Sequence, residues 1–176
     1  MPDLFYERKF EGPIIGIDEA GRGPWAGPVT VAAVWLCPLS YDYLPADIDD
    51  SKKIKSARRA SLANILMAPP HRYHTVSLDA EKIDQVGILQ ATFAAMVAAT
   101  SGLCDQFAAA QMPGPAHALV DGNLLPPDMP LPATALVRGD RRSLSIAAAS
   151  IIAKTARDQI MCDLDAIFPG YGWANN

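Results

Sequence analysis

The chain has 176 residues, half of them hydrophobic and 19% charged, which excludes a disordered or fibrous protein and is typical of one globular domain. Its formal net charge of −4 at pH 7 excludes the strongly basic composition common among nucleic-acid binders, so any such binding has to depend on local clusters. Three widely spaced cysteines in no CxxC pattern exclude a disulfide framework and a structural zinc site.

The N-terminal stretch 1–12 carries both signs of charge and no apolar core, unlike a secretory signal. No apolar run along the chain reaches the length needed to span a bilayer. The free cysteines are also typical of a reducing compartment. We therefore expect a single cytoplasmic domain over residues 1–176, without a membrane partner.

The first half of the chain predicts a hairpin, a helix and a third strand. The short apolar runs 14–18 and 28–36 predict two buried strands joined by a glycine-rich connection. Residues 56–67 have apolar positions at helical spacing and two prolines beyond them, which predict a helix capped by Ser56. Residues 72–79 predict the next strand.

The second half adds helices and two further short strands. Helical spacing runs from about residue 80 to residue 102, with a break at Gly87. The short apolar runs 116–122 and 134–140 predict strands, and each run contains or ends in an Asp. The alanine-rich run 143–168 predicts a long helix. Strands and helices mixed within one domain imply an α/β or α+β fold.

Acidic residues recur where the predicted strands end: Asp18 with Glu19, Asp121, and Asp140. Strand ends of a mixed sheet bring distant residues together, so we expect one acidic site. Four carboxylates repel one another unless a cation lies among them, and oxygen ligands suit Mg²⁺ or Mn²⁺. Such a site is typical of two-metal phosphodiester hydrolysis. A metal-free acid pair, and turn or capping roles for the single Asp residues, are the alternatives.

The adjacent acids Asp18 and Glu19 set a geometric condition. Consecutive strand side chains point to opposite faces, so both reach one site only if the backbone leaves regular β geometry at Glu19. The following glycines provide that exit. Two interpretations of Gly21 and Gly23 stay open: turn residues with positive φ, or bare backbone that approaches a polynucleotide closely enough to sense a sugar hydroxyl.

Two basic clusters stand out against the acidic total charge. They consist of Lys52, Lys53, Lys55, Arg58 and Arg59, and of Arg138, Arg141 and Arg142. The simplest interpretation of each cluster alone is a solvated surface. Together they offer local positive charge on an acidic protein.

Five motifs in order resemble the type 2 ribonucleases H, the ribonuclease HII family. They are GIDEAGRGPWAGPV (16–29), DSKK (50–53), VDGN (120–123), VRGD (137–140) and IAAASIIAKTARD (146–158). The resemblance implies an α/β, ribonuclease H-like fold with a mixed five-stranded sheet flanked by helices. It also implies endonucleolytic cleavage of RNA in RNA/DNA hybrids and on the 5′ side of a ribonucleotide embedded in duplex DNA. The products of such cleavage carry 3′-hydroxyl and 5′-phosphate ends.

The resemblance also implies roles for single residues. Asp18, Glu19, Asp121 and Asp140 match the catalytic, metal-binding carboxylates; Gly21, Arg22 and Gly23 match the loop that recognises the ribose 2′-hydroxyl; Lys52, Ser150 and Lys154 lie in motifs that resemble phosphate contacts. Asp158 shares the last motif and is expected to be a surface or supporting acid.

One departure from the family lies at the end of the chain. In the family, the stretch similar to YGWANN (171–176) continues into a Lys-Gly-Tyr motif and a helical segment, and Tyr171 does not match that tyrosine. We therefore expect a monomeric catalytic domain that lacks this segment. Two other functions stay open: a catalytically weak, hybrid-binding form of the domain, and another metal nuclease of the same fold, such as a junction resolvase.

Overall fold

The computed structural model describes residues 1–175, and Asn176, the last residue of YGWANN, lies outside this part. Five strands form one sheet in the order β3-β2-β1-β4-β5. Their bounds are Ile14–Ala20 (β1), Val29–Trp35 (β2), Arg72–Leu78 (β3), His117–Asp121 (β4) and Ala133–Leu136 (β5). β2 pairs antiparallel with β1 and β3, whereas β4 runs parallel to β1 and β5. The predicted mixed five-stranded sheet is therefore confirmed.

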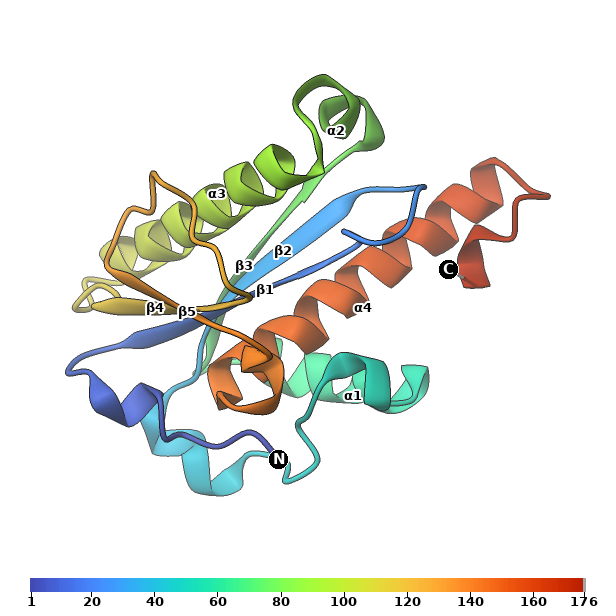
Figure 1. Cartoon of the computed structure of the whole chain (residues 1–176). Helices are drawn as coiled ribbons and strands as arrows, with labels where there is room; N and C mark the ends of the chain where they lie inside the picture. Colours follow the sequence, from blue (N-terminus) through green and yellow to red (C-terminus); the bar gives the residue numbers. More distant parts are fainter. Residues whose placement is uncertain (176) are drawn as a thin grey trace.

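Helices cover both faces of the sheet, with α3 on one face and α4 and α1 on the other (Figure 1). The helices are α1 (Ser56–Met67), α2 (Ala80–Val86), α3 (Ile88–Ala109) and α4 (Leu144–Ile167). The predicted hairpin, the helix over 56–67 and the break at Gly87, where φ is 81°, are confirmed. The long helix over 143–168 is also confirmed, since Ser143 is the residue that caps α4.

The face covered by α3 holds a core of large apolar side chains. The rings of Trp35 and Phe107 meet there edge to face, with their centroids 5.3 Å apart, and Met96 and Leu103 are buried in the same core. α3 is long and apolar enough to cross a membrane, by length and composition only, so the prediction that no apolar run has this length is wrong. The helix lies along one face of the sheet (Figure 1), and its buried side chains belong to the same apolar core as those of the strands, which is the position of a core helix.

Small residues let α4 approach the other face of the sheet closely. A Cβ at Gly16 of β1 would overlap the backbone of Ser145. The three successive alanines Ala147–Ala149 are fully buried on the same side. The hydroxyl of Ser143 caps this helix, because it accepts a hydrogen bond of 3.3 Å from the amide of Ile146. The close approach holds the polar side chains of α4 near the ends of β1 and β4.

The end of β5 differs from the prediction. The strand stops at Leu136, and Arg138 then adopts a left-handed conformation, with φ at 56°, that turns the chain away from the sheet. The next residues, Gly139–Arg141, form the short 3-10 turn η4. Asp140 therefore lies in a turn after β5 and not at the end of a strand.

Two helix ends also differ from the prediction. The residue before α1 is Lys55, which makes no capping bond with its side chain, so the prediction that Ser56 caps the helix is wrong. Ser56 is instead the first residue of the helix. α3 continues past Gly102 to Ala109, because its buried face, which includes Leu103, remains covered by the sheet.

Candidate active site

A pocket of about 370 Å³ lies where β1 and β4 end. The four acids expected to be catalytic line it: Asp18 and Glu19 from β1, Asp121 from β4 and Asp140 from η4. The residues expected to bind nucleic acid line it too: Gly21, Arg22, Gly23, Lys52, Ser150 and Lys154. The fold thus brings together every predicted site residue from five separate segments of the chain.

Asp18 and Glu19 both face this pocket although they are consecutive residues of a regular strand. β1 stays paired with β2 through Ala20, so the predicted departure from β geometry at Glu19 is wrong. Both residues line the pocket close to the end of β1, whose last residue is Ala20. The carboxylate of Glu19 lies there, 3.7 Å from the guanidinium of Arg22.

Burial and mutual repulsion raise the pKa values of three of these acids, Asp18, Glu19 and Asp140. Burial is the largest cause for Asp18, and the carboxylates of Asp121 and Glu19 add to it, so the pKa of Asp18 lies well above its ordinary value. Burial and then Asp121 also raise the pKa of Glu19. The same two causes, in the same order, raise the pKa of Asp140. Asp121 is therefore the acid whose charge acts on the other three.

The position of Asp121 is set by the turn that carries Asp140. The amide of Gly139 donates a hydrogen bond of 2.6 Å to Oδ1 of Asp121. A Cβ at Gly139 would crowd the side chains of Ile146 and Asp121, so the close packing of this turn favours glycine. Two of the acids are therefore held together through one backbone amide.

The donor chemistry of the pocket fits a hard divalent cation, since carboxylate oxygens are the ligands that Mg²⁺ and Mn²⁺ prefer. A cation among these acids would offset the burial and repulsion that raise the pKa values of Asp18 and Asp140. Within residues 1–175, no three His, Cys, Asp or Glu side chains are already spaced to hold one ion. Mg²⁺ usually keeps several water ligands and binds through one or two carboxylates, so these acids can still supply the protein ligands of a cation.

The connection between β1 and β2 is held by Arg157 of α4. This side chain is 1% exposed, and it donates hydrogen bonds to the carbonyl oxygens of Pro28 at 3.0 Å and Ala26 at 2.9 Å. Gly21 has a φ of 98°, and a Cβ there would overlap the Arg157 side chain. Gly21 is thus required by the turn and by this contact, whereas Gly23 has open space around it.

The predicted phosphate contacts lie beside the acids. Lys52 is exposed, whereas Ser150 is buried and shares a hydrogen bond of 2.9 Å with the hydroxyl of Ser51. Lys154 is half-buried and donates a hydrogen bond of 2.6 Å to Asp158. Lys52 therefore reaches solvent freely, while Lys154 is held in place by its own helix.

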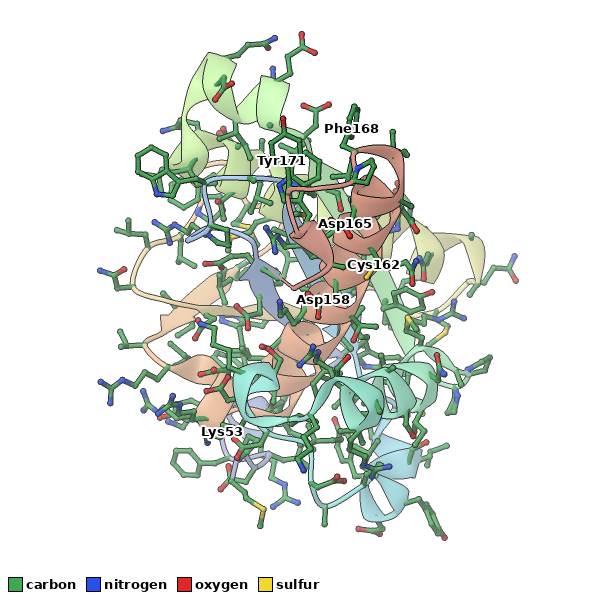
Figure 2. All side chains as sticks on the ribbon, turned by 90° about the vertical axis from the view of Figure 1, so that its right-hand side faces the viewer. Lys53, Asp158, Cys162, Asp165, Phe168 and Tyr171 are labelled. Atoms are coloured by element: carbon green, nitrogen blue, oxygen red, sulfur yellow. The ribbon has the colours of Figure 1, made fainter. Side chains whose placement is uncertain are left out.

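Asp158 supports Lys154 and also joins two helices. Its second oxygen accepts a hydrogen bond of 2.7 Å from Arg59 of α1. Figure 2 shows Asp158, Cys162 and Asp165 following one another along α4 toward Phe168 and Tyr171. Their spacing of three or four residues places them on one face of the helix, so Asp158 lies at the pocket end of this face. This position agrees with the supporting role expected for Asp158.

Acids of the same chain neutralise much of the two basic clusters. Arg58 pairs with Asp47, Lys53 with Asp49, Arg59 with Asp158 and Arg141 with Asp50. The interpretation of these clusters as solvated surface is wrong for Arg59, which is 9% exposed and also donates to the carbonyl oxygens of Ser51 and Ile54. Arg59 is therefore a structural side chain that supports the turn before α1.

Sequence reasoning missed two residues that shape the pocket, Asp50 and Arg157. Asp50 is 3% exposed, and it accepts hydrogen bonds of 3.0 Å from the amide of Lys52 and from the guanidinium of Arg141. It thereby ties the turn that carries Lys52 to the turn that carries Asp140. The signal for Asp50 was the DSKK motif, because an Asp before such a turn is a typical cap. No local signal marked Arg157 as buried.

Comparison with known proteins gives the family. The family model for Ribonuclease HII matches residues 15–176. A curated relative named Ribonuclease HII, from Jannaschia sp. (strain CCS1), is 48% identical over 178 residues, which cover 99% of this chain and 82% of the relative. Ribonuclease HII from Rhodospirillum rubrum is also 48% identical, over 100% of this chain and 78% of the relative.

Solved structures share the fold. The structure of the PCNA:RNase HII complex from Archaeoglobus fulgidus matches with a TM-score of 0.68 and 27% identity, over 93% of this chain and 81% of that chain. Bst-RNase HIII in complex with Mn²⁺ matches with a TM-score of 0.74 and 22% identity, over 88% of this chain and 55% of that chain. Together with the acidic pocket, this fold defines the class of ribonuclease H-like nucleases.

Within this class, the chain belongs to the ribonuclease HII family. It is accordingly an enzyme, an endonuclease that hydrolyses phosphodiester bonds. The predicted α/β, ribonuclease H-like fold is confirmed. All five sequence motifs, from residue 16 to residue 158, lie within the matched residues 15–176.

Proposed function

We propose that this chain is a metal-dependent endoribonuclease that cleaves the RNA of RNA/DNA hybrids and cuts on the 5′ side of a ribonucleotide embedded in duplex DNA. The observation that carries the proposal is the meeting of four acids, a glycine-rich connection and two lysines in one pocket of about 370 Å³. The products would carry 3′-hydroxyl and 5′-phosphate ends. A cytoplasmic location and a monomeric state stay predictions.

Four acids would hold the cations in this proposal: Asp18, Glu19, Asp121 and Asp140. When bound, Mg²⁺ or Mn²⁺ would supply the Lewis acidity that activates water and stabilises the leaving oxygen of a phosphodiester. Support comes from the raised pKa values of three of these acids, because a site that crowds buried carboxylates becomes favourable once positive charge is present. The solved Bst-RNase HIII complex with Mn²⁺ adds a structural neighbour that binds such an ion.

The glycine-rich connection would recognise the ribonucleotide. Gly23 has open space where a side chain would stand, so backbone there can approach a ribose closely. The 2′-hydroxyl is the group that distinguishes RNA from DNA at a given nucleotide. Arg157 would keep this backbone in position, since it donates to two carbonyl oxygens of the connection. A held backbone discriminates better than a mobile one, because less order has to be gained on binding.

Lys52 and Lys154 would bind phosphates on either side of the scissile bond. Both line the pocket, and their charge compensates locally for the acidic net charge of the protein. The pairing of Lys154 with Asp158 at 2.6 Å limits its freedom but leaves other donor hydrogens of the ammonium group for a phosphate. We therefore expect binding to weaken as the salt concentration rises.

The test is cleavage of a labelled DNA duplex that contains one ribonucleotide, with an all-DNA duplex of the same sequence as control. Each duplex is incubated with the protein in EDTA, in Mg²⁺ and in Mn²⁺. The proposal predicts cutting on the 5′ side of the ribonucleotide in either metal, no cutting in EDTA and no cutting of the all-DNA duplex. The new 3′ end should be extended by a DNA polymerase.

The other outcomes separate the alternative functions. Retained binding without cutting in saturating Mn²⁺ would favour the catalytically weak, hybrid-binding form. Cutting of branched DNA that contains no ribose would favour another metal nuclease of the same fold. Cutting in EDTA at the rate seen in Mg²⁺ would contradict metal dependence.

A further inference from the structure

A buried acid that does not line the active-site pocket lies at the start of α4. Glu7, in the 3-10 turn η1 (Glu7–Lys9), is 5% exposed. Its Oε1 accepts three hydrogen bonds, from the Ser143 hydroxyl at 2.6 Å, the Ser145 amide at 2.9 Å and the Ser145 hydroxyl at 2.7 Å. Its Oε2 is buried with no hydrogen-bond partner in the described part of the chain.

A continuous path of hydrogen bonds joins Glu7 to the catalytic acids. Ser143, which donates to Glu7, gives its amide hydrogen to the carbonyl oxygen of Gly139 at 2.8 Å. The amide of Gly139 in turn donates to Oδ1 of Asp121 at 2.6 Å. Asp140 is the residue directly after Gly139. The carboxylate of Glu7 is thus three hydrogen bonds away from Asp121, through the turn that carries Asp140.

The backbone of the N-terminal segment makes the same connection. The carbonyl oxygen of Asp3 accepts a hydrogen bond of 2.9 Å from the amide of Leu144, and Asp3 and Ser143 form a parallel bridge. The guanidinium of Arg142 also binds the hydroxyl of Tyr6. Figure 1 shows the N-terminal segment lying beside the start of α4, far from it in the sequence. The segment therefore contacts the residues that link η4 to α4.

A capping role alone does not account for Glu7. Ser143 already caps α4 with its own hydroxyl, which accepts from the amide of Ile146. A buried carboxylate with one oxygen lacking a partner is unfavourable compared with an exposed cap, even at the positive end of a helix dipole. The contacts of Glu7 instead fix the rotation of the Ser143 and Ser145 side chains, and with them the backbone that leads back to Gly139.

We infer that Glu7 is a positioning residue that sets the distance between Asp121 and Asp140 for cation binding. The inference rests on the proposed function, because it takes these two acids as cation ligands. Glu7 does not touch the substrate or the ion. It acts through Ser143 and Gly139. Without Glu7, Asp121 and Asp140 would still lie in the pocket, but the distance between them would vary more.

The test compares Glu7→Ala with Glu7→Gln and the wild-type chain. Glu7→Ala should lower kcat by up to roughly tenfold, the lower end of the loss that follows removal of a direct partner of a metal ligand, because Glu7 acts through Ser143 and Gly139. KM for the duplex should change little. It should also raise the Mn²⁺ concentration needed for half-maximal activity. Glu7→Gln keeps an acceptor oxygen for Ser143 and should recover most of the rate.

Mn²⁺ binding can be measured without any nucleic acid present. The electron paramagnetic resonance signal of free Mn²⁺ reports how much of the ion remains unbound. Glu7→Ala should bind Mn²⁺ up to roughly tenfold more weakly than the wild-type chain. Leu103→Ala serves as the matched control, because Leu103 is fully buried on the α3 face, away from the pocket. This variant should lower the melting temperature and leave Mn²⁺ affinity unchanged. If Glu7→Ala does not fold, Glu7→Asp replaces it, since it keeps the charge but withdraws the oxygens by one methylene.

The outcomes distinguish the inference from the proposed function. A wild-type chain that binds Mn²⁺ and cuts the duplex, with a Glu7 variant that only melts earlier, would overturn the inference alone. A wild-type chain that neither binds Mn²⁺ nor cuts would overturn the proposed function, and the inference with it. Weaker Mn²⁺ binding and a lower kcat in Glu7→Ala and Glu7→Asp, but not in Leu103→Ala, would support the inference.

Discussion

The two faces of the sheet are packed in different ways. On the α3 side, large side chains such as Trp35 and Phe107 fill the space between helix and strands. On the α4 side, Gly16 and the alanines Ala147–Ala149 leave so little space that the helix backbone itself lies against β1. The first arrangement buries apolar area, and the second brings helix and strand close together.

This difference separates stability from chemistry. α4 supplies Ser150, Lys154 and Arg157 to the pocket, whereas α3 supplies no lining residue to it. The short distance between α4 and β1 lets side chains from the helix reach groups at the strand end. The α3 face therefore serves as a scaffold, and changes there should alter stability while leaving cleavage unaffected. Changes on the α4 face should alter both.

The largest effect is expected from Asp121→Asn. The substitution removes a ligand charge but keeps the volume and the oxygen that accepts from Gly139. Cleavage should fall by at least roughly a hundredfold, the upper loss seen when only an outer partner of a ligand is removed. The circular dichroism spectrum should stay that of the wild-type chain. A variant that cuts at the wild-type rate would contradict the assignment of Asp121.

The same substitution on the two faces gives the sharpest comparison. Gly16→Ala places a Cβ into the backbone of Ser145 and should destabilise the fold by about 1–3 kcal/mol or more. Gly102→Ala in α3 meets first the imidazole of His74, a side chain that can move, and it gains helix propensity. Its net effect should lie within about 1 kcal/mol. Urea unfolding measures both, and equal losses would contradict the difference between the faces.

The next largest effect is expected from Arg157→Met, which loosens the glycine-rich connection between β1 and β2. It leaves the buried carbonyl oxygen of Pro28 and the part-buried one of Ala26 without their donor, which costs about 1–3 kcal/mol for the buried acceptor. Part of this loss should appear as a KM raised roughly tenfold, because the connection becomes mobile. Steady-state kinetics on the single-ribonucleotide duplex measures it. An unchanged KM would show that Arg157 supports the fold without positioning the connection.

The smallest effect is expected from Arg22→Ala. Arg22 is about half exposed, and its pair with Glu19 at 3.7 Å is worth less than about 1 kcal/mol. Binding should weaken modestly, while discrimination between the ribonucleotide duplex and the all-DNA duplex should persist if backbone does the recognition. The measurement is the ratio of cleavage rates on the two duplexes. Cutting of the all-DNA duplex by this variant would mean that the side chain provides the discrimination.

Local patterns predicted the elements well and the pocket in outline. The strands, the helix over 56–67 and the break at Gly87 follow from apolar spacing and breakers, which act over a few residues. The left-handed conformation of Arg138, which moves Asp140 into a turn, carries no such signal, because arginine does not favour it. Local sequence also carries no signal that Glu19 keeps regular β geometry, because this geometry depends on pairing with the neighbouring strand β2.

The remaining gaps concern contacts between distant segments. Glu7 and Ser143 lie 136 residues apart, and Arg157 meets Pro28 across 129 residues. Burial of a charged residue depends on such partners, so composition around Glu7 or Arg157 does not reveal it. The residues that touch the substrate in the proposed function were predictable from motifs, and so was the supporting acid Asp158, whereas Glu7 and Arg157 were not.

The central claim is that the four acids at the ends of β1 and β4 and in η4 form one divalent-cation site. Calorimetric titration of Mn²⁺ into the nucleic-acid-free wild-type chain and into Asp121→Asn tests it most directly. The account predicts saturable binding by the wild-type chain and affinity at least roughly tenfold weaker in the variant. Equal affinity in both chains, or no binding by the wild-type chain, would contradict it.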